Sequence, residues 1–132
     1  MKIGIAGFIA GLGIVCAAVT PSAHHSFSAE FDANQPITVA GTVSKVEWTN
    51  PHARFSVAGK DSAGTAATYD FELGSSSSLL RRGWTRTTLK IGEAVTVEGY
   101  RARKAAHVAN ARTVTLSDGR KVLAGSSIEA RP

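Results

Sequence analysis

The sequence predicts an all-β domain with one short helix, in the form of a five-stranded Greek-key barrel of the OB type. Five stretches alternate apolar and polar residues with the period of two that a strand requires, and a short helical stretch lies between the third and the fourth. In the first stretch the apolar residues change from odd to even positions, in the order Ile37, Val39, Val43, Val46 and Trp48. This change requires one extra residue near Ser44 and Lys45, which is a β-bulge. A bulged first strand that joins two parts of a sheet is typical of small Greek-key barrels. A β-sandwich is the alternative, but it has no place for the helix.

The strands are expected at residues 37–48, 53–58, 67–73, 95–100 and 108–116. A tight loop at Asn50-Pro51 follows the first strand. The second and third should form a hairpin through the turn Gly59–Gly64. Ser117-Asp118-Gly119-Arg120 contains the Asp-Gly pair of a type I′ hairpin turn, so residues 121–123 should return as a short strand.

The short helix is expected to follow a run of serines. A serine among residues 75–78 can cap its first turn, and Gly83 can end it at the C′ position. Three apolar side chains are expected to be buried at the bottom of the barrel: Leu79, Leu80 and Trp84. Arg81 and Arg82 should stay largely exposed. The alternative is that the arginines around this tryptophan hold an anion or a sugar acid.

The first residues have the pattern of a secretory signal peptide. Met1-Lys2 is a short positive region, Ile3–Val19 is an uncharged apolar run, and Thr20–Ala23 supplies small residues for cleavage. An N-terminal membrane anchor is the alternative. Cys16 lies inside this segment, so the mature chain is expected to have no cysteine and no disulfide. We therefore expect a periplasmic or secreted protein.

The expected organisation is a signal peptide at residues 1–23, an N-terminal arm at 24–35, an OB-like domain at 36–123 and a polar tail at 124–132. Removal of the signal peptide leaves 14 Lys and Arg against 10 Asp and Glu, a net charge of +4. This mild basic excess is consistent with a solvated surface. Export argues against nucleic acid as a partner, and no membrane contact is expected of the mature form. The oligomeric state stays open.

Several motifs resemble a family of small exported bacterial proteins of unknown function. The matching segments cover essentially the whole mature chain and are His24–Phe27, Glu30–Asp32, Val46–His52, Phe71–Gly74, Leu79–Thr85, Val97–Ala102 and Asn110–Leu116. His107 is not part of this pattern. The resemblance implies export and a small β fold, and it implies no activity.

The first candidate site is a metal site made of histidines. The four histidines lie at the mature start or in expected loops, at His24, His25, His52 and His107. Neutral imidazole is a common ligand of Cu(II), Ni(II) and Zn(II). If cleavage follows Ala23, the amine and ring of His24 can chelate Cu(II), and His25 or His52 can complete the site. Cleavage after Ser22 would instead create an amine-X-His site. The alternative is a solvated terminus, with His52 only capping the Asn-Pro turn.

The second candidate site follows from the OB fold, which binds ligands on strands two and three and in the loops between strands one and two and between four and five. Here these loops are residues 48–52 and 101–107. Trp48 and Asn50 could stack on and hydrogen-bond a flat ligand, with Arg101 and Arg103 contributing charge. Equally, the tryptophan could fill the core and the asparagine could satisfy backbone groups of the turn.

Catalysis has little support in the sequence. Nucleophile-elbow, phosphate-loop and dinucleotide motifs are absent from the sequence, and the pair Asp70 and Glu72 is expected to be solvated on an outward face. We therefore expect a binding protein and not an enzyme. Its first specific form is a periplasmic copper protein, and its alternative is a module that binds a small ligand or another periplasmic protein without metal. A copper-dependent oxidase is a third interpretation.

Overall fold

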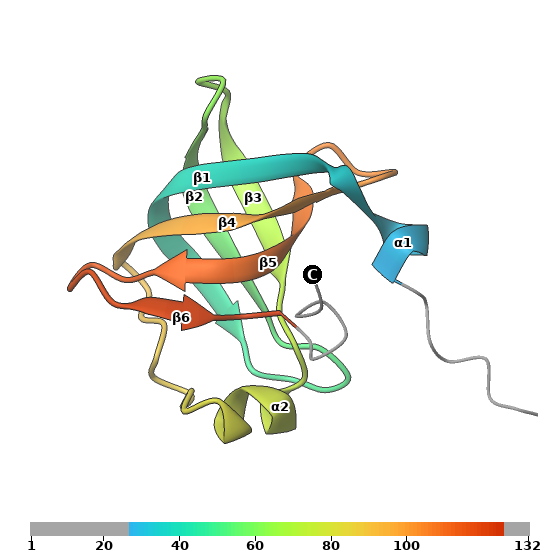
Figure 1. Ribbon diagram of the computed structural model, residues 1–132. Helices are drawn as coiled ribbons and strands as arrows, with labels where there is room; N and C mark the ends of the chain where they lie inside the picture. The colour runs from blue at the N-terminus through green and yellow to red at the C-terminus, as the bar shows by residue number, and fades with distance from the viewer. Residues whose placement is uncertain (1–26, 126–132) are drawn as a thin grey trace, which may run out of the picture.

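The fold is all-β, with six strands and two short helices. The computed structural model describes residues 27–125. The predicted signal peptide, His24, His25 and the tail from residue 126 lie outside the described residues. In chain order the elements are α1 (Phe27–Glu30), β1 (Phe31–Glu47), β2 (Arg54–Asp61), β3 (Ala66–Glu72), α2 (Ser76–Arg81), β4 (Ala94–Ala102), β5 (Val108–Thr115) and β6 (Lys121–Leu123) (Figure 1). Neither of the helices described is long and apolar enough to cross a membrane.

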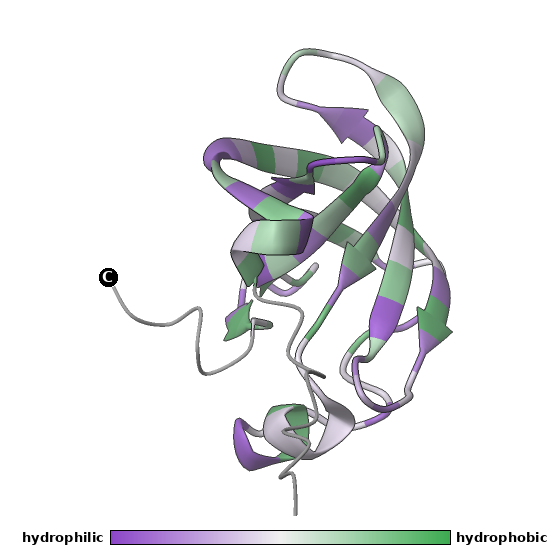
Figure 2. Cartoon of the chain, turned by 90° about the vertical axis from the view of Figure 1, so that its right-hand side faces the viewer, coloured by the Kyte–Doolittle hydropathy of each residue, from purple (hydrophilic) through white to green (hydrophobic). Residues whose placement is uncertain are grey.

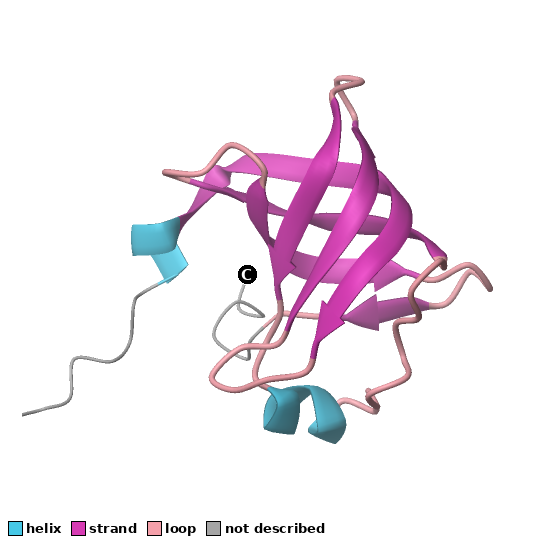
Figure 3. Ribbon diagram, turned by 180° about the vertical axis from the view of Figure 1, so that it is seen from behind, coloured by secondary structure: helices cyan, strands magenta, loops and turns pink. Residues whose placement is uncertain are grey.

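The long strand β1 organises the sheet. It pairs antiparallel with both β2 and β4, as expected, and the strand order is β3-β2-β1-β4-β5-β6. A parallel pairing between β3 and β5 joins residues 70–72 to residues 108–110. This pairing closes the strands β1 to β5 into a ring, which Figures 1 and 3 show from opposite sides.

The predicted bulge in β1 is confirmed. Val43 lies opposite Val57, but Lys45 lies opposite Ser56, so Ser44 is the extra residue. The strand begins earlier than expected, because residues 31–35 of the predicted arm belong to it. Phe31 is buried and pairs with β4, while the residues after it have no apolar alternation that could have revealed a strand.

The turn between β5 and β6 differs from the prediction. A type I′ turn needs positive φ at both central residues. Among the described residues, positive φ occurs only at glycines, and Gly119 has φ 88°. The Gly119 N–H donates to the Leu116 carbonyl at 3.0 Å, and the Leu116 N–H donates to the Arg120 carbonyl at 2.8 Å. This is a type I turn followed by a left-handed glycine, and Asp118 Oδ1 supports it by accepting from the Arg120 N–H at 2.9 Å.

Both predicted ends of α2 are confirmed. The Ser75 hydroxyl accepts from the Ser78 N–H at 3.2 Å, which caps the first turn. At the other end Gly83 has φ 87°, the Gly83 N–H donates to Leu80 and the Trp84 N–H donates to Leu79. These two bonds form a Schellman motif.

The residues of α2 are buried on one side only. Leu79 and Trp84 are buried as expected, but Leu80 is 56% exposed, contrary to the prediction. Neighbouring residues of a helix point about 100° apart, so this short helix cannot bury both leucines against one surface. The Trp84 indole N–H donates to the Leu123 carbonyl at 2.9 Å, and Arg82 is half-buried because it donates to the Gly125 carbonyl.

The core fills the inside of the ring. Apolar and polar residues alternate along the strands in Figure 2, and the inward ones form a single buried cluster. Phe55 and Phe71 stack within it with ring centroids 5.4 Å apart. Their packing fixes the β2–β3 hairpin, and the ends of these two strands form one wall of the pocket described next.

Candidate functional pocket

A pocket of about 510 Å³ lies where α1, the β2–β3 hairpin and the β4–β5 loop meet. Four charged residues line it: Glu30, Arg54, Glu72 and Lys104. The other lining residues are apolar: Ala29, Phe31, Ala102, Ala105 and Val108. The volume falls in the range of small-molecule sites.

Three strand pairings bring these residues to one place. The register of β2 and β3 places Arg54 opposite Glu72. The parallel pairing of β3 with β5 places Glu72 beside the first residues of β5, and the pairing of β1 with β4 places Phe31 opposite Ala102. The pocket therefore depends on contacts between segments that are far apart in sequence.

Arg103 holds α1 against the β4–β5 loop. Its backbone N–H donates to the Glu30 carbonyl at 2.9 Å, its Nε donates to the Ser28 carbonyl at 2.8 Å, and its Nη1 lies 3.1 Å from Asp32 Oδ2. The Phe27 ring also lies against Tyr100, with centroids 5.7 Å apart. These contacts fix the wall of the pocket that α1 supplies.

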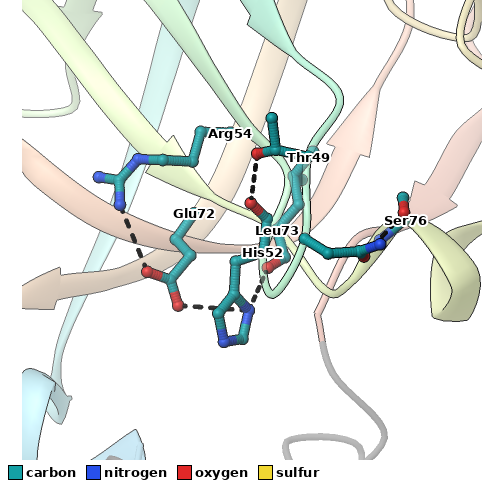
Figure 4. Close-up of polar contacts among 7 residues, drawn as sticks. Thr49, His52, Arg54, Glu72, Leu73 and Ser76 are labelled. Atoms are coloured by element: carbon teal, nitrogen blue, oxygen red, sulfur yellow. Dashed lines mark hydrogen bonds and ion pairs between the residues drawn. The ribbon is translucent and has the colours of Figure 1, made fainter.

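Glu72 is the least exposed of the four charged residues that line the pocket. Its side chain is only 14% exposed, with Oε2 lying 3.5 Å from Arg54 Nη1 and Oε1 lying 3.6 Å from His52 Nδ1 (Figure 4). Burial raises the pKa of this carboxyl, and the attraction of His52 and Arg54 does not fully offset it, while the nearby Glu30 raises the pKa further. The sequence-based expectation of a solvated Asp70 and Glu72 pair is therefore wrong for Glu72.

His52 has a defined ring orientation. Its Nδ1 lies 3.0 Å from the Leu73 carbonyl oxygen, as Figure 4 shows. A carbonyl oxygen can only accept, so Nδ1 bears the hydrogen, and Nε2 of the neutral ring keeps its lone pair. The side chain is 45% exposed, so part of the ring is open to solvent.

The loop that contains His52 is fixed at both sides. The Thr49 hydroxyl donates to the His52 carbonyl at 3.0 Å, and the Asn50-Pro51 peptide is cis. Asn50 Oδ1 accepts from the backbone N–H and the hydroxyl of Ser76, at 3.2 and 2.8 Å. The asparagine thus connects the loop to α2.

The predicted ligand residues Trp48, Asn50, Arg101 and Arg103 do not line the pocket. Trp48 is half-buried against the core, and Arg101 Nη2 lies 2.8 Å from Asp61 Oδ2. Each of the four residues thus has a contact within the protein, and their binding of a ligand stays a prediction. The predicted loop 101–107 does contribute to the pocket, through Lys104 and Ala105.

The predicted metal ligands are only partly described. His24 and His25 lie outside the described residues. Within residues 27–125, no group of three or more His, Cys, Asp or Glu side chains is placed to hold a metal ion. His107 is exposed, and its ring lies edge-on to Tyr69 with centroids 5.3 Å apart.

Three charged pocket residues were missed by the sequence analysis: Glu30, Arg54 and Glu72. Arg54 and Glu72 lie on the polar side of their strands, which suggested solvent. The available signal was their opposite charge at positions that face each other across the predicted hairpin, next to His52.

A family model with the description "Family of unknown function (DUF6152)" matches residues 11–110. The chain belongs to this family. The expected membership of a family of unknown function is therefore confirmed, and the residues matched to DUF6152 include every residue that lines the pocket. No curated protein and no solved structure matches the chain.

Proposed function

We propose that this protein is an exported, periplasmic binding protein with an OB-like barrel, which takes a small ligand into the pocket between α1, the β2–β3 hairpin and the β4–β5 loop. The observation that supports this most is the position of the pocket. Its lining includes Arg54 and Glu72 on strands two and three, and Lys104 in the loop between strands four and five. OB folds bind their ligands at these places.

The OB-like interpretation rests on several features together. The first strand is bulged and pairs with two neighbours, and the ring closes through a parallel pairing of β3 and β5. The helix α2 lies between β3 and β4 in sequence. Export rests on the signal-peptide pattern of residues 1–23.

Binding without chemistry is the simplest use of this pocket. It combines a few charged groups with an apolar wall, as small-molecule sites do. The carboxylates Glu30 and Glu72 lie among the lining residues, but the sequence contains none of the common nucleophile motifs that could use them.

A screen of the processed protein tests this proposal. Small acids, amines, amino acids and sugars would be added separately to ¹⁵N-labelled protein, and amide shifts would be followed by NMR. We expect at least one class to give saturable shifts confined to residues around the pocket, such as Phe31, Glu72 and Val108. Saturable shifts only at other surfaces, or no saturable shifts from any class, would contradict the proposal.

Cu(II) binding by His24, His25 and His52 is the second candidate function. The observation that favours it is the hydrogen bond from His52 Nδ1 to the Leu73 carbonyl. Metal-binding histidines commonly donate one ring N–H to a carbonyl or carboxylate, which orients the other nitrogen toward the metal. The nearby Glu72 would add a negative charge close to the ring.

A further inference from the structure

Two basic side chains of the pocket have hydrogen-bond donors with no partner among the described residues. Lys104 is exposed, and its ammonium group has no hydrogen bond or ion pair among residues 27–125. Arg54 touches Glu72 only through Nη1, at 3.5 Å, and no described residue accepts from its Nε or Nη2. These N–H groups can donate hydrogen bonds to a bound ligand.

Both carboxyl oxygens of Glu72 already have a basic side chain of the protein nearby. One oxygen of Glu72 lies near Arg54 and the other near His52. An added cation would compete with these two partners. An added anion would instead use the open donors, and Arg54 could contact it while keeping its contact with Glu72, because a guanidinium has five N–H groups.

Glu72 repels an anion less than an unpaired carboxylate would, because Arg54 Nη1 lies 3.5 Å from its Oε2. Burial raises the pKa of this carboxyl, so its ionised form is less favoured than that of a solvated carboxylate. The apolar residues, among them Phe31 and Val108, form the remaining wall and suit a hydrocarbon group.

Resting on the proposed small-ligand function, we infer that the pocket binds a small organic acid, with its carboxylate between Arg54 and Lys104 and its apolar body against Phe31 and Val108. The lining holds two cations and two carboxyl groups, so the selection comes from the N–H groups of Arg54 and Lys104 that have no partner among the described residues, and not from a net charge. The planar arginine adds directional contacts. The apolar wall selects against small inorganic anions, which cannot use it.

Three probes of matched shape test this inference: cyclohexanecarboxylate, cyclohexanecarboxamide and cyclohexylmethylammonium. Each would be titrated into the processed protein while pocket amide shifts are measured by NMR. We expect the carboxylate to bind at least about tenfold more tightly than either of the others, which corresponds to about 1.4 kcal/mol for the charge-assisted contacts. Chloride would be added as a control for an effect of anions in general.

Two substitutions locate the carboxylate. Lys104→Met and Arg54→Met should each weaken binding of cyclohexanecarboxylate by about fivefold or more, whereas Lys60→Met and Arg81→Met, at exposed positions away from the pocket, should leave it unchanged. Lys104 has no described partner, so its substitution is not expected to disturb folding, and the melting temperature of each variant checks this.

The outcomes separate this inference from the proposed function. If the amide or the ammonium probe binds the pocket as tightly as the carboxylate, the inferred ligand class is wrong and the pocket is still a binding site. If none of the three probes shifts the pocket amides, the inference is also wrong, and the wider screen decides the proposed function. Equal binding to the Lys104→Met variant would overturn the inferred position of the carboxylate.

Discussion

His52 Nδ1 lies 3.0 Å from the carbonyl oxygen of Leu73 and 3.6 Å from Oε1 of the neighbouring Glu72. One ring nitrogen therefore connects the loop after β1 to the end of β3. This single relationship fixes the tautomer of the ring and brings a basic group to a carboxyl with a raised pKa at the edge of the pocket.

The first prediction concerns copper. If Cu(II) binds through the N-terminal histidines with His52, His52→Ala should weaken Cu(II) binding by about tenfold or more, because one ligand and its orientation are lost. Calorimetry of the correctly processed protein measures this. Affinity should also fall steeply below pH about 6.5, because imidazole must lose its proton before it binds.

Two controls show which version of the copper site holds. His107→Ala should leave Cu(II) binding unchanged, because this histidine lies against Tyr69. One extra residue before the mature N-terminus should weaken binding if the terminal amine is a ligand. No Cu(II) uptake at neutral pH by the processed protein would remove the metal candidate and leave the pocket as the binding site.

The second prediction concerns Glu72, whose pKa is raised by burial in the folded state. The carboxyl of Glu72 therefore binds a proton more tightly in the folded protein than in the unfolded chain. Its contribution to the free energy of unfolding grows as pH falls through the raised folded pKa. At pH values above that pKa, the buried charge of Glu72 destabilises the folded state. Glu72→Gln mimics the protonated form. It should increase the free energy of unfolding at pH 7, because a neutral amide avoids the burial of a charge.

Denaturant unfolding of both proteins between about pH 4 and 8 measures the effect. The advantage of Glu72→Gln should shrink as pH is lowered. Glu47→Gln is the control, because Glu47 is more exposed and pairs with Lys45 at 2.7 Å. A variant less stable than the wild type at pH 7 would mean that the contacts with Arg54 and His52 outweigh the burial.

The third prediction concerns Asp61, which joins the β2–β3 hairpin to β4. The ion pair with Arg101 lowers the pKa of this carboxyl, and N–H groups of Thr65 and Ala63 lower it further. Its stabilising effect is present above the unfolded pKa of about 3.9 and is lost as pH falls through the lower folded pKa. Asp61→Asn should therefore lower the melting temperature at neutral pH, and the difference from the wild type should narrow in acid.

A double-mutant cycle isolates the ion pair. Asp61→Asn keeps an acceptor for the two backbone N–H groups but removes the charge that faces Arg101. With Arg101→Met, the two single changes should cost more in sum than the double change does. Additive effects, or a stability difference independent of pH, would show that the pair contributes little.

The fourth prediction concerns Trp84, which is buried in the core. Trp84→Ala should cost about 3–5 kcal/mol in the free energy of unfolding, because a buried large side chain is removed. Trp84→Phe keeps most of the apolar contact but removes the donor to the Leu123 carbonyl, and should cost about 1–2 kcal/mol.

Urea unfolding measures both changes. Leu80→Ala is the matched control on the same helix, and it should change stability by less than about 0.5 kcal/mol, because Leu80 is 56% exposed. A loss below about 1 kcal/mol for Trp84→Ala would contradict the buried position of the indole.

Local signals predicted much of the fold. The bulge at Ser44 followed from the change of face in β1, and the ends of α2 followed from Ser75 and Gly83. Each of these depends on a few neighbouring residues, whose backbone geometry is limited by their own side chains. The type I′ prediction at Asp118 was wrong because the aspartate instead accepts from a backbone N–H in a type I turn.

The pocket could not be predicted in the same way. It depends on the parallel pairing that brings Glu72 to the start of β5, and on the three contacts by which Arg103 holds α1 and the start of β1. These contacts link residues more than 35 positions apart, and periodicity says nothing about such pairs. The sequence indicated the loop with Lys104, but not that Glu30, Arg54 and Glu72 line the same pocket.

A variant with a filled pocket tests the central claim most directly. Ala105 lines the pocket, and Ala63 lies exposed in the β2–β3 turn outside it. The affinity of the tightest-binding compound from the screen would be measured for Ala105→Trp, with Ala63→Trp as the control. We predict that Ala105→Trp weakens binding by about tenfold or more, whereas Ala63→Trp leaves it unchanged. Both variants should have the melting temperature of the wild type. Unchanged affinity for the Ala105→Trp variant would contradict the assignment of this pocket as the binding site.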